Sequence, residues 1–223
     1  GALGGTQVVA GALRAVGLVF SSWRAIAADN LFKSYAYGAP LASFKEAKGY
    51  YDCSEEVGGV ARCIDDVDFI GHKFTAALIF SGSKLVMFSL VSPFDTDLHA
   101  KALGSIAKTF KLTSLSDGKS LFDVVQASAT AKTQEDLSSK LSNYETRALG
   151  GGTVTYTFYE GVEPNKGYRN MSSQLSALPD NVRAAELILT GEGPDTVLLI
   201  RFSFPKLEAN KAADAAMKPV ESF

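Results

Sequence analysis

The chain has 223 residues, of which 46% are hydrophobic and 21% are charged. This composition is typical of a globular protein with a sizeable core, because the charged share is too low for a disordered chain. Lysine and arginine number 22 against 24 aspartates and glutamates, so the formal net charge is −2. A nearly neutral chain without a polybasic cluster is not expected to bind nucleic acid or an anionic membrane surface.

The first 36 residues form an apolar N-terminal segment with few charges. Arg14 interrupts its apolar stretch, so the uninterrupted part is too short to span a membrane. Apolar side chains recur every three or four residues, at Val9, Leu13, Val16, Phe20, Trp23 and Ala27. This spacing predicts an amphipathic helix, capped by Thr6, that packs on the body of the protein. The sequence leaves open what preceded Gly1, including a signal peptide or a lipid tether to a membrane.

Cys53 and Cys63 are the only cysteines, and they lie on either side of Gly58 and Gly59. The glycine pair predicts a hairpin turn that brings the two cysteines face to face, within reach of a disulfide. Two reduced thiols in a cytosolic protein are the alternative. A metal site has less support, since two cysteines and two distant histidines supply too few ligands. A disulfide would place the protein outside the cytoplasm.

The first predicted unit comprises residues 37–112. It contains a short helix over 41–48, strands over 50–57, 60–69, 72–80 and 84–91, and a helix over 96–110. The connections between these strands are short. Short connections predict an antiparallel meander, because parallel strands need long crossovers.

The second predicted unit, residues 113–223, follows a similar order. It contains helices over 121–131 and 134–148, strands over 153–159, 182–190 and 196–204, and a closing helix over 206–217. We therefore expect an α+β protein made of two tandem repeats, each an antiparallel sheet covered by helices, with the extra N-terminal helix.

Two of the expected strands are apolar on both sides, at residues 85–88 and 197–200. Such strands are typical of the centre of a sheet that is covered on both faces. The N-terminal helix, the opposing repeat or a partner molecule could supply the second cover.

Two sets of residues are candidates for binding. Tyr35, Tyr37, Tyr50 and Tyr51 gather ahead of the first hairpin. They could form a recognition surface, since tyrosine offers contact area at low entropic cost, although packing of the N-terminal helix would explain them equally well. Phe80, Leu85 and Phe88 could form one wall of a site for a small apolar ligand between the sheet and the N-terminal helix.

Catalytic constellations are missing from the sequence. The two histidines, His72 and His99, are isolated, and none of the common catalytic or phosphate-binding motifs is present. A hydrolase that uses His99 with Asp95 or Asp97 is a weak hypothesis. Asp65, Asp66 and Asp68 could attract calcium, but strand alternation predicts that Asp65 points away from the other two. We expect neither a cofactor nor a metal.

The first half resembles one repeat of the β-lactamase inhibitory protein family. The similarity covers residues 37–91 and includes Tyr37-Gly38 before a short helix, Gly49, the cysteine pair and the long strands that end at Leu90. The small lipoproteins of the outer-membrane assembly machinery share this layout. The resemblance implies a helix-on-sheet unit that occurs in tandem, a disulfide in the first hairpin and an envelope location.

The sequence as a whole predicts a non-enzymatic protein of the bacterial cell envelope, located in the periplasm or at the outer membrane. It would act by recognising another envelope protein. The alternative is a binding module for a small apolar ligand.

Overall fold

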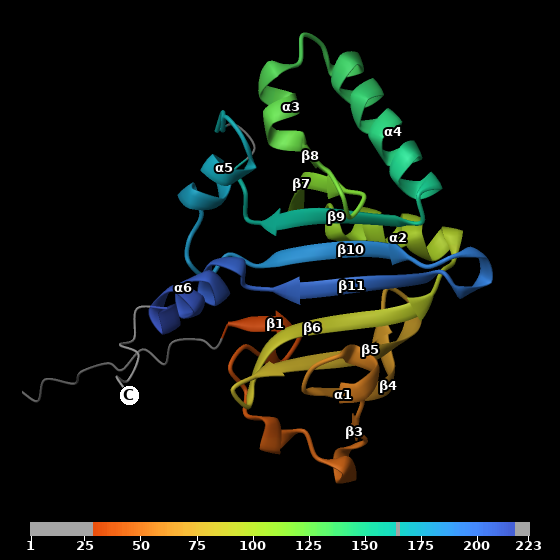
Figure 1. The fold of residues 1–223 in the computed structure, drawn as a ribbon, viewed down its shortest axis with the longest axis vertical. Helices are drawn as coiled ribbons and strands as arrows, with labels where there is room; N and C mark the ends of the chain where they lie inside the picture. Colours follow the sequence, from red (N-terminus) through yellow and green to blue (C-terminus); the bar gives the residue numbers. More distant parts are fainter. Residues whose placement is uncertain (1–28, 164–165, 217–223) are drawn as a thin grey trace, which may run out of the picture.

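The computed structural model describes residues 29–163 and 166–216, and its centre is an antiparallel nine-stranded sheet (Figure 1). The strand order is β3-β4-β5-β6-β11-β10-β9-β7-β8. In that order the strands span Tyr51–Asp52, Ala61–Phe69, His72–Ser81, Lys84–Pro93, Val197–Ser203, Ala184–Thr190, Thr153–Glu160, Phe110–Ser116 and Leu121–Asp123. The α+β class is confirmed.

The sheet is continuous across the two halves of the chain. β6 from the first half pairs with β11 from the second over seven residue pairs, centred on Leu90 and Ile200. The expectation of two separate sheets is therefore wrong. Both strands are apolar on both sides, and pairing them buries their backbone groups in the middle of one sheet.

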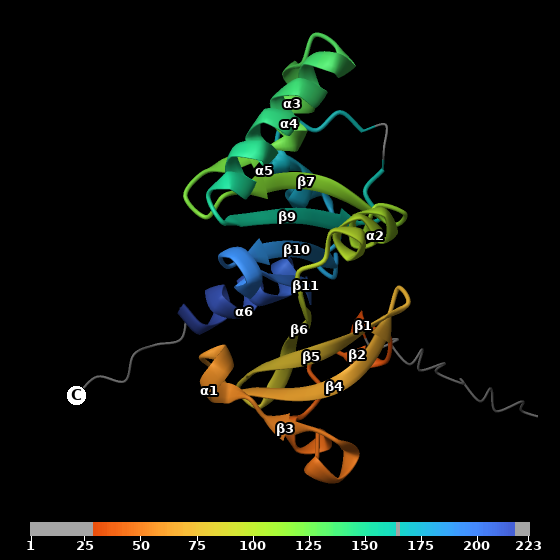
Figure 2. The same cartoon turned by 90° about the vertical axis from the view of Figure 1, so that its right-hand side faces the viewer.

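Helices and a small second sheet surround the main sheet. The helices are α1 (Ser54–Val57), α2 (Thr96–Ile106), α3 (Val124–Thr130), α4 (Gln134–Gly150), α5 (Met171–Ala177) and α6 (Pro205–Ala216). The small sheet pairs β1 (Asn30–Phe32) with β2 (Tyr35–Ala36). It lies with α2 on one side of the main sheet, while α1 lies on the other (Figure 2). Helix α6 follows β11 and contacts Tyr37, next to the small sheet, through Glu208. No helix in the described ranges is long and apolar enough to cross a membrane.

The main hydrophobic core lies on the α2 side of the sheet. Leu78, Phe88, Leu198 and Ile200 point into it from neighbouring strands and are fully buried. Phe32 of β1 stacks on Phe88, with ring centroids 4.9 Å apart. Burial of each such side chain stabilises the fold by roughly 1.5–3 kcal/mol. The core therefore stabilises the sheet from one face only.

The segment predicted as a strand over 50–57 is mostly not extended. Only Tyr51–Asp52 forms a strand, and the four-residue α1 follows in place of a tight hairpin turn. Two glutamates in the first turn suit a helix N-terminus. Gly58, in the left-handed conformation with φ 85°, ends the helix. The predicted helix over 41–48 is likewise two single 3₁₀ turns, at Leu41–Ser43 and Glu46–Lys48.

Three further elements differ from the sequence prediction. The helix expected to reach residue 110 ends at Ile106, and Phe110 begins β7. The segment 121–131 opens with the short strand β8 before α3. Helix α5 was not predicted, although it begins with a capping box at Asn170 and Ser173. The other strands and helices predicted after residue 36 are confirmed within a few residues at their ends.

The predicted domain boundaries can be located on the described structure. The boundary after residue 112 lies inside β7. Within 1–36, the predicted helix over 9–27 lies outside the described residues, and the remaining part contains β1 and β2. The division into units 37–112 and 113–223 stays a prediction.

Candidate functional site

A groove of about 1120 Å³ lies on the face of the sheet opposite the main core. Its floor consists of alternate residues of three neighbouring strands, β5, β6 and β11. One cross-strand row contains Ala77, Ser89 and Arg201, and the next contains Thr75, Val91 and Leu199. The groove therefore lies directly over the β6–β11 pairing that unites the two halves of the chain.

The hollow shape follows from side-chain size. Ala77 and Ser89 are small, and the row continues on β4 with Cys63. Val91 and Leu199 in the next row are larger and only half-buried. Because successive residues of a strand point to opposite faces, the large side chains Leu78 and Phe88 point into the main core, and the floor carries the small Ala77 and Ser89 beside them.

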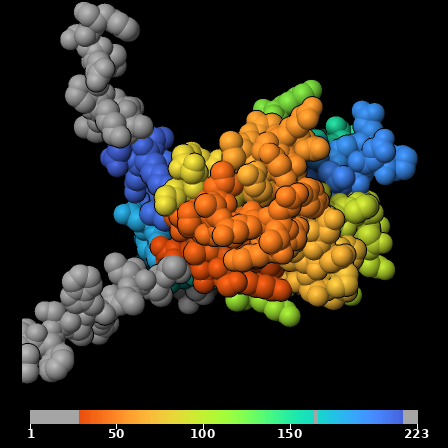
Figure 3. Space-filling model, turned by 90° about the horizontal axis from the view of Figure 1, so that it is seen from below, coloured from red at the N-terminus to blue at the C-terminus, as the bar shows by residue number. Residues whose placement is uncertain are grey.

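Two segments form the walls of the groove. On one side stand Tyr51 and α1, which contributes Glu56 and Val57. On the other side stands the β10–β11 connection, a 3₁₀ turn at Gly193–Asp195 that contributes Asp195. The amide of Phe94, just after β6, donates to the Thr196 carbonyl at 2.9 Å and holds this turn beside the sheet. In the view from below, the light-blue turn projects beside the orange segments of the first half (Figure 3).

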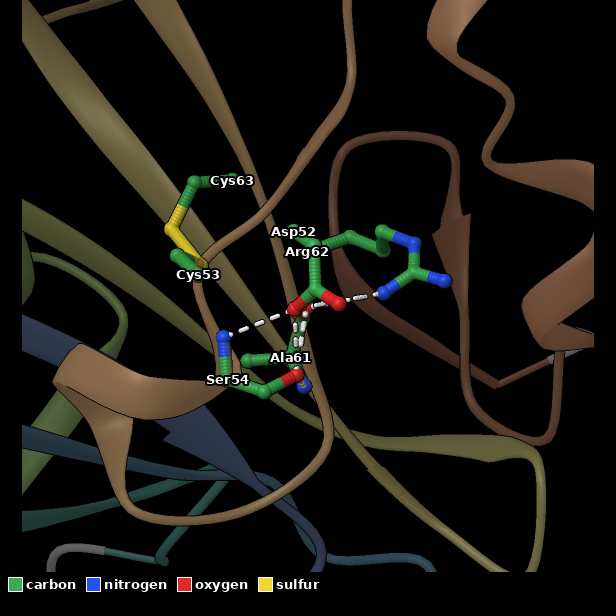
Figure 4. A network of polar contacts seen from close by, with 6 residues as sticks. All are labelled: Asp52, Cys53, Ser54, Ala61, Arg62 and Cys63. Atoms are coloured by element: carbon green, nitrogen blue, oxygen red, sulfur yellow. Dashed lines mark hydrogen bonds and ion pairs between the residues drawn. A yellow bond between two sulfur atoms is a disulfide. The ribbon is translucent and has the colours of Figure 1, made fainter.

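The Cys53–Cys63 disulfide anchors the first wall, and its prediction is confirmed. The two Cα atoms are 5.8 Å apart, and the bond joins the residue before α1 to β4 (Figure 4). Both cysteines are about 5% exposed and line the floor beside Ala77. The disulfide therefore fixes the position of the first wall relative to the floor.

A polar network holds the start of α1 from its other side. Asp52 accepts hydrogen bonds from the Ser54 amide at 2.9 Å and from the Ser54 hydroxyl at 2.5 Å (Figure 4). The Ser54 hydroxyl also accepts from the Ala61 amide of β4 at 3.0 Å. Arg62 lies 3.6 Å from Asp52. The hydrogen bonds from Ser54 hold the pKa of the Asp52 carboxyl below its usual value.

Carboxylates dominate the rim. The Tyr51 hydroxyl donates to Asp65 at 2.7 Å, and the Thr75 hydroxyl donates to the same oxygen at 3.1 Å. The bond to Asp65 is the main cause that raises the pKa of Tyr51 to about 12, and the charge of Glu56 adds to it. Arg201, on the floor, makes two hydrogen bonds of 3.2 and 3.1 Å to Glu186.

The structure does not bring the four candidate tyrosines to one exposed surface. Tyr35 is half-buried on the core side, where its ring lies 4.6 Å from that of Phe88 and its hydroxyl pairs with that of Tyr50. Tyr37 packs on Phe204 and binds Glu208 of α6. Only Tyr51 is exposed, at 41%, and it alone lines the groove. Tyr50 and Tyr51 also line a second hollow of about 670 Å³ at the β3 edge of the sheet.

The candidate apolar ligand face is occupied by other parts of the chain. Phe80, Leu85 and Phe88 are all at most 6% exposed. Phe44 packs on Phe80, and Phe32 packs on Phe88. Neighbours in the described ranges therefore pack directly on these side chains. The N-terminal helix that the ligand hypothesis placed opposite them lies outside the described residues.

The histidines and the neighbouring acids are engaged separately. Asp95 accepts from the Leu98 amide at 2.8 Å and caps α2, so it serves the helix and not the imidazole of His99. His99 lies between Phe94 and Tyr156, and its Nε2 is buried with no hydrogen-bond partner among the described residues. His72 bonds to Ser92 at 2.9 Å.

The acidic stretch of β4 is arranged differently from the predicted alternation. A bulge between Ile64 and Val67 inserts one extra residue, with Asp66 at φ 59°. Asp65 consequently binds Thr75, and Asp68 binds Lys73, on the same face of the sheet. Within the described ranges, no three His, Cys, Asp or Glu residues are grouped so that they could hold a metal ion.

Sequence reasoning missed the floor residues of the groove as a site. The apolar run at 197–200 carried a signal, because its residues face both sides of the sheet, and Val197 and Leu199 lie on the floor. Among the described residues, the main core covers one side of the paired strands, and the other side forms the floor of the groove. A comparison of the chain with protein-family models, curated proteins and solved structures finds no match.

Proposed function

We propose that this chain is a non-enzymatic protein of the bacterial cell envelope that acts by recognising another protein, and that the groove is its recognition surface. The observation that carries the proposal is the half-exposed apolar floor at the centre of the sheet, formed by Val91, Val197 and Leu199. Apolar surface that a folded chain leaves open at its centre, with polar residues around it, is typical of protein interaction sites.

The envelope location has separate support. Disulfides persist in oxidising compartments, and the Cys53–Cys63 bond indicates such a site for this chain. The periplasm or the outer membrane is the finer location that we propose, on the resemblance of residues 37–91 to the β-lactamase inhibitory protein family.

The two halves of the sheet also support an origin by duplication. Moving outward from the β6–β11 pair, β5 and β4 lie on one side, and β10 and β9 lie on the other. Each set is followed in the chain by a helix, α2 after β6 and α6 after β11. We propose that these are related repeats, as the resemblance implies.

Site-specific photo-crosslinking in the native host tests the recognition surface. A photo-reactive amino acid at Val57, 39% exposed on the groove wall, should form an adduct with an exported protein. The same probe at Leu121, 57% exposed on β8, is the control and should form none. An adduct at both positions, or at neither, would contradict the proposal.

A further inference from the structure

We infer that the groove takes a polypeptide segment in which lysine or arginine side chains alternate with aliphatic or aromatic ones. This inference rests on the proposed function and adds the chemistry of the partner.

Both walls of the groove present free carboxylates. Glu56 lies on α1, and Asp195 lies on the facing turn. Neither forms an ion pair with another described residue. Asp65 does not line the groove but lies beside it, where it accepts hydrogen bonds from the neutral hydroxyls of Tyr51 and Thr75, two residues that do. These bonds leave its negative charge uncompensated.

The cations nearby are already paired. Arg201, the only basic residue among the described ones that line the groove, is matched by Glu186 on the neighbouring strand. Lys73 is matched by Asp68, and Arg62 faces Asp52. The local charge that remains is therefore negative on the two walls beside an apolar floor, and a cationic partner complements it.

The floor also restricts how a partner can bind. β5, β6 and β11 are hydrogen-bonded on both sides, so a partner cannot join them as an added strand. It must insert side chains. Lysine and arginine suit this site, since their aliphatic stems can cover Val91 and Leu199 while their charged ends reach the carboxylates of the rim.

Labelled peptides test this inference on the purified full chain by fluorescence anisotropy. The probes are a peptide of alternating lysine and leucine, one of alternating glutamate and leucine, and one of alternating lysine and serine. We expect the lysine–leucine peptide to bind best, because it alone satisfies both the floor and the rim.

A charge-removing variant supplies the matched comparison. Glu56→Gln combined with Asp195→Asn should weaken binding of the lysine–leucine peptide by about threefold to tenfold, with a smaller difference at high ionic strength. The control combines Glu135→Gln with Asp97→Asn, two exposed acids in the first turns of α4 and α2 that do not line the groove. It should bind as the unaltered chain does. Thermal unfolding establishes that both variants are folded.

The outcomes separate this inference from the proposed function. Equal binding of the lysine and glutamate peptides, no binding of either, or equal losses in both variants would overturn the cationic partner. Crosslinking at Val57 would still stand in each of these cases. Failure of the crosslink would instead overturn the recognition surface itself.

Discussion

His99 is a histidine whose surroundings disfavour its charged form. Burial between aromatic rings lowers its pKa below the ordinary value, although the charge of Glu145 partly opposes this. A lowered pKa in the folded state means that the unfolded chain binds the proton more readily. Stability is therefore full above the unfolded pKa of about 6.5 and falls as the pH drops below it.

Replacing His99 with leucine should reduce this pH dependence. We expect the free energy of unfolding of the unaltered chain to decrease between about pH 7.5 and about pH 5.5, and that of His99→Leu to change less. Denaturant titrations at the two pH values measure the difference. His72→Leu is the control, because it removes the hydrogen bond to Ser92 and leaves His99 in place. An unchanged slope in His99→Leu would contradict the assignment.

Gly191 is the residue that lets β10 turn toward the groove. Its φ is 116°, and a Cβ placed there would lie 2.7 Å from the Asp195 carbonyl oxygen. Gly191→Ala should lower the free energy of unfolding by about 2–4 kcal/mol, since strain and a backbone clash add together. Gly118 has φ 88° with open space around it, so Gly118→Ala should cost only about 1 kcal/mol. Similar losses in the two variants would show that the clash is relieved at little cost.

At the scale of elements, α1 depends on its covalent attachment. A four-residue helix is too short to be stable alone, so the disulfide and the Asp52 network hold it in place. Replacing Cys53 and Cys63 together with alanine should lower the free energy of unfolding by about 2–4 kcal/mol. In this double variant the amides of α1 should also exchange with solvent faster than in the unaltered chain, and the increase should be larger for α1 than for α2.

Thiol titration of the purified chain checks the premise of that prediction. The native protein should show no free thiol before reduction and two after reduction in denaturant. Two free thiols without a reductant would remove the support for an oxidising compartment. An exchange rate of α1 unaltered by the double replacement would mean that the polar network suffices to hold the helix.

At the scale of the molecule, the β6–β11 pair makes the two halves one cooperative unit. Ile200 is fully buried at the centre of this pair, opposite Leu90. Ile200→Ala should cost about 2–5 kcal/mol. The most protected amides of β5 and β10, on either side of the pair, should lose protection by the same amount in native-state hydrogen exchange. A loss confined to the second half would show that the halves unfold independently.

Local patterns accounted for most of the elements and few of the contacts. The three long strands of the first half, together with β9, β10 and β11, were predictable from their apolar runs and the glycines between them. β7, β8 and α5 were not predicted. β8 and α5 are short. β7 is as long as β10, but it forms by pairing with β9, which is distant in the chain. Of the groove, only Tyr51, Cys53 and Cys63 were predicted as functional or structural residues, since their spacing is local.

The sequence by itself determined the α+β class, the cysteine pair and the two strands that are apolar on both sides. These depend on composition and on short spacings, which act within one or two neighbouring elements. Only the tertiary structure decided that the two halves share one sheet and that its centre carries an open groove with acidic walls. That outcome depends on β6 meeting β11 and on α1 facing the 193–195 turn, and contacts between segments more than a hundred residues apart leave no local pattern.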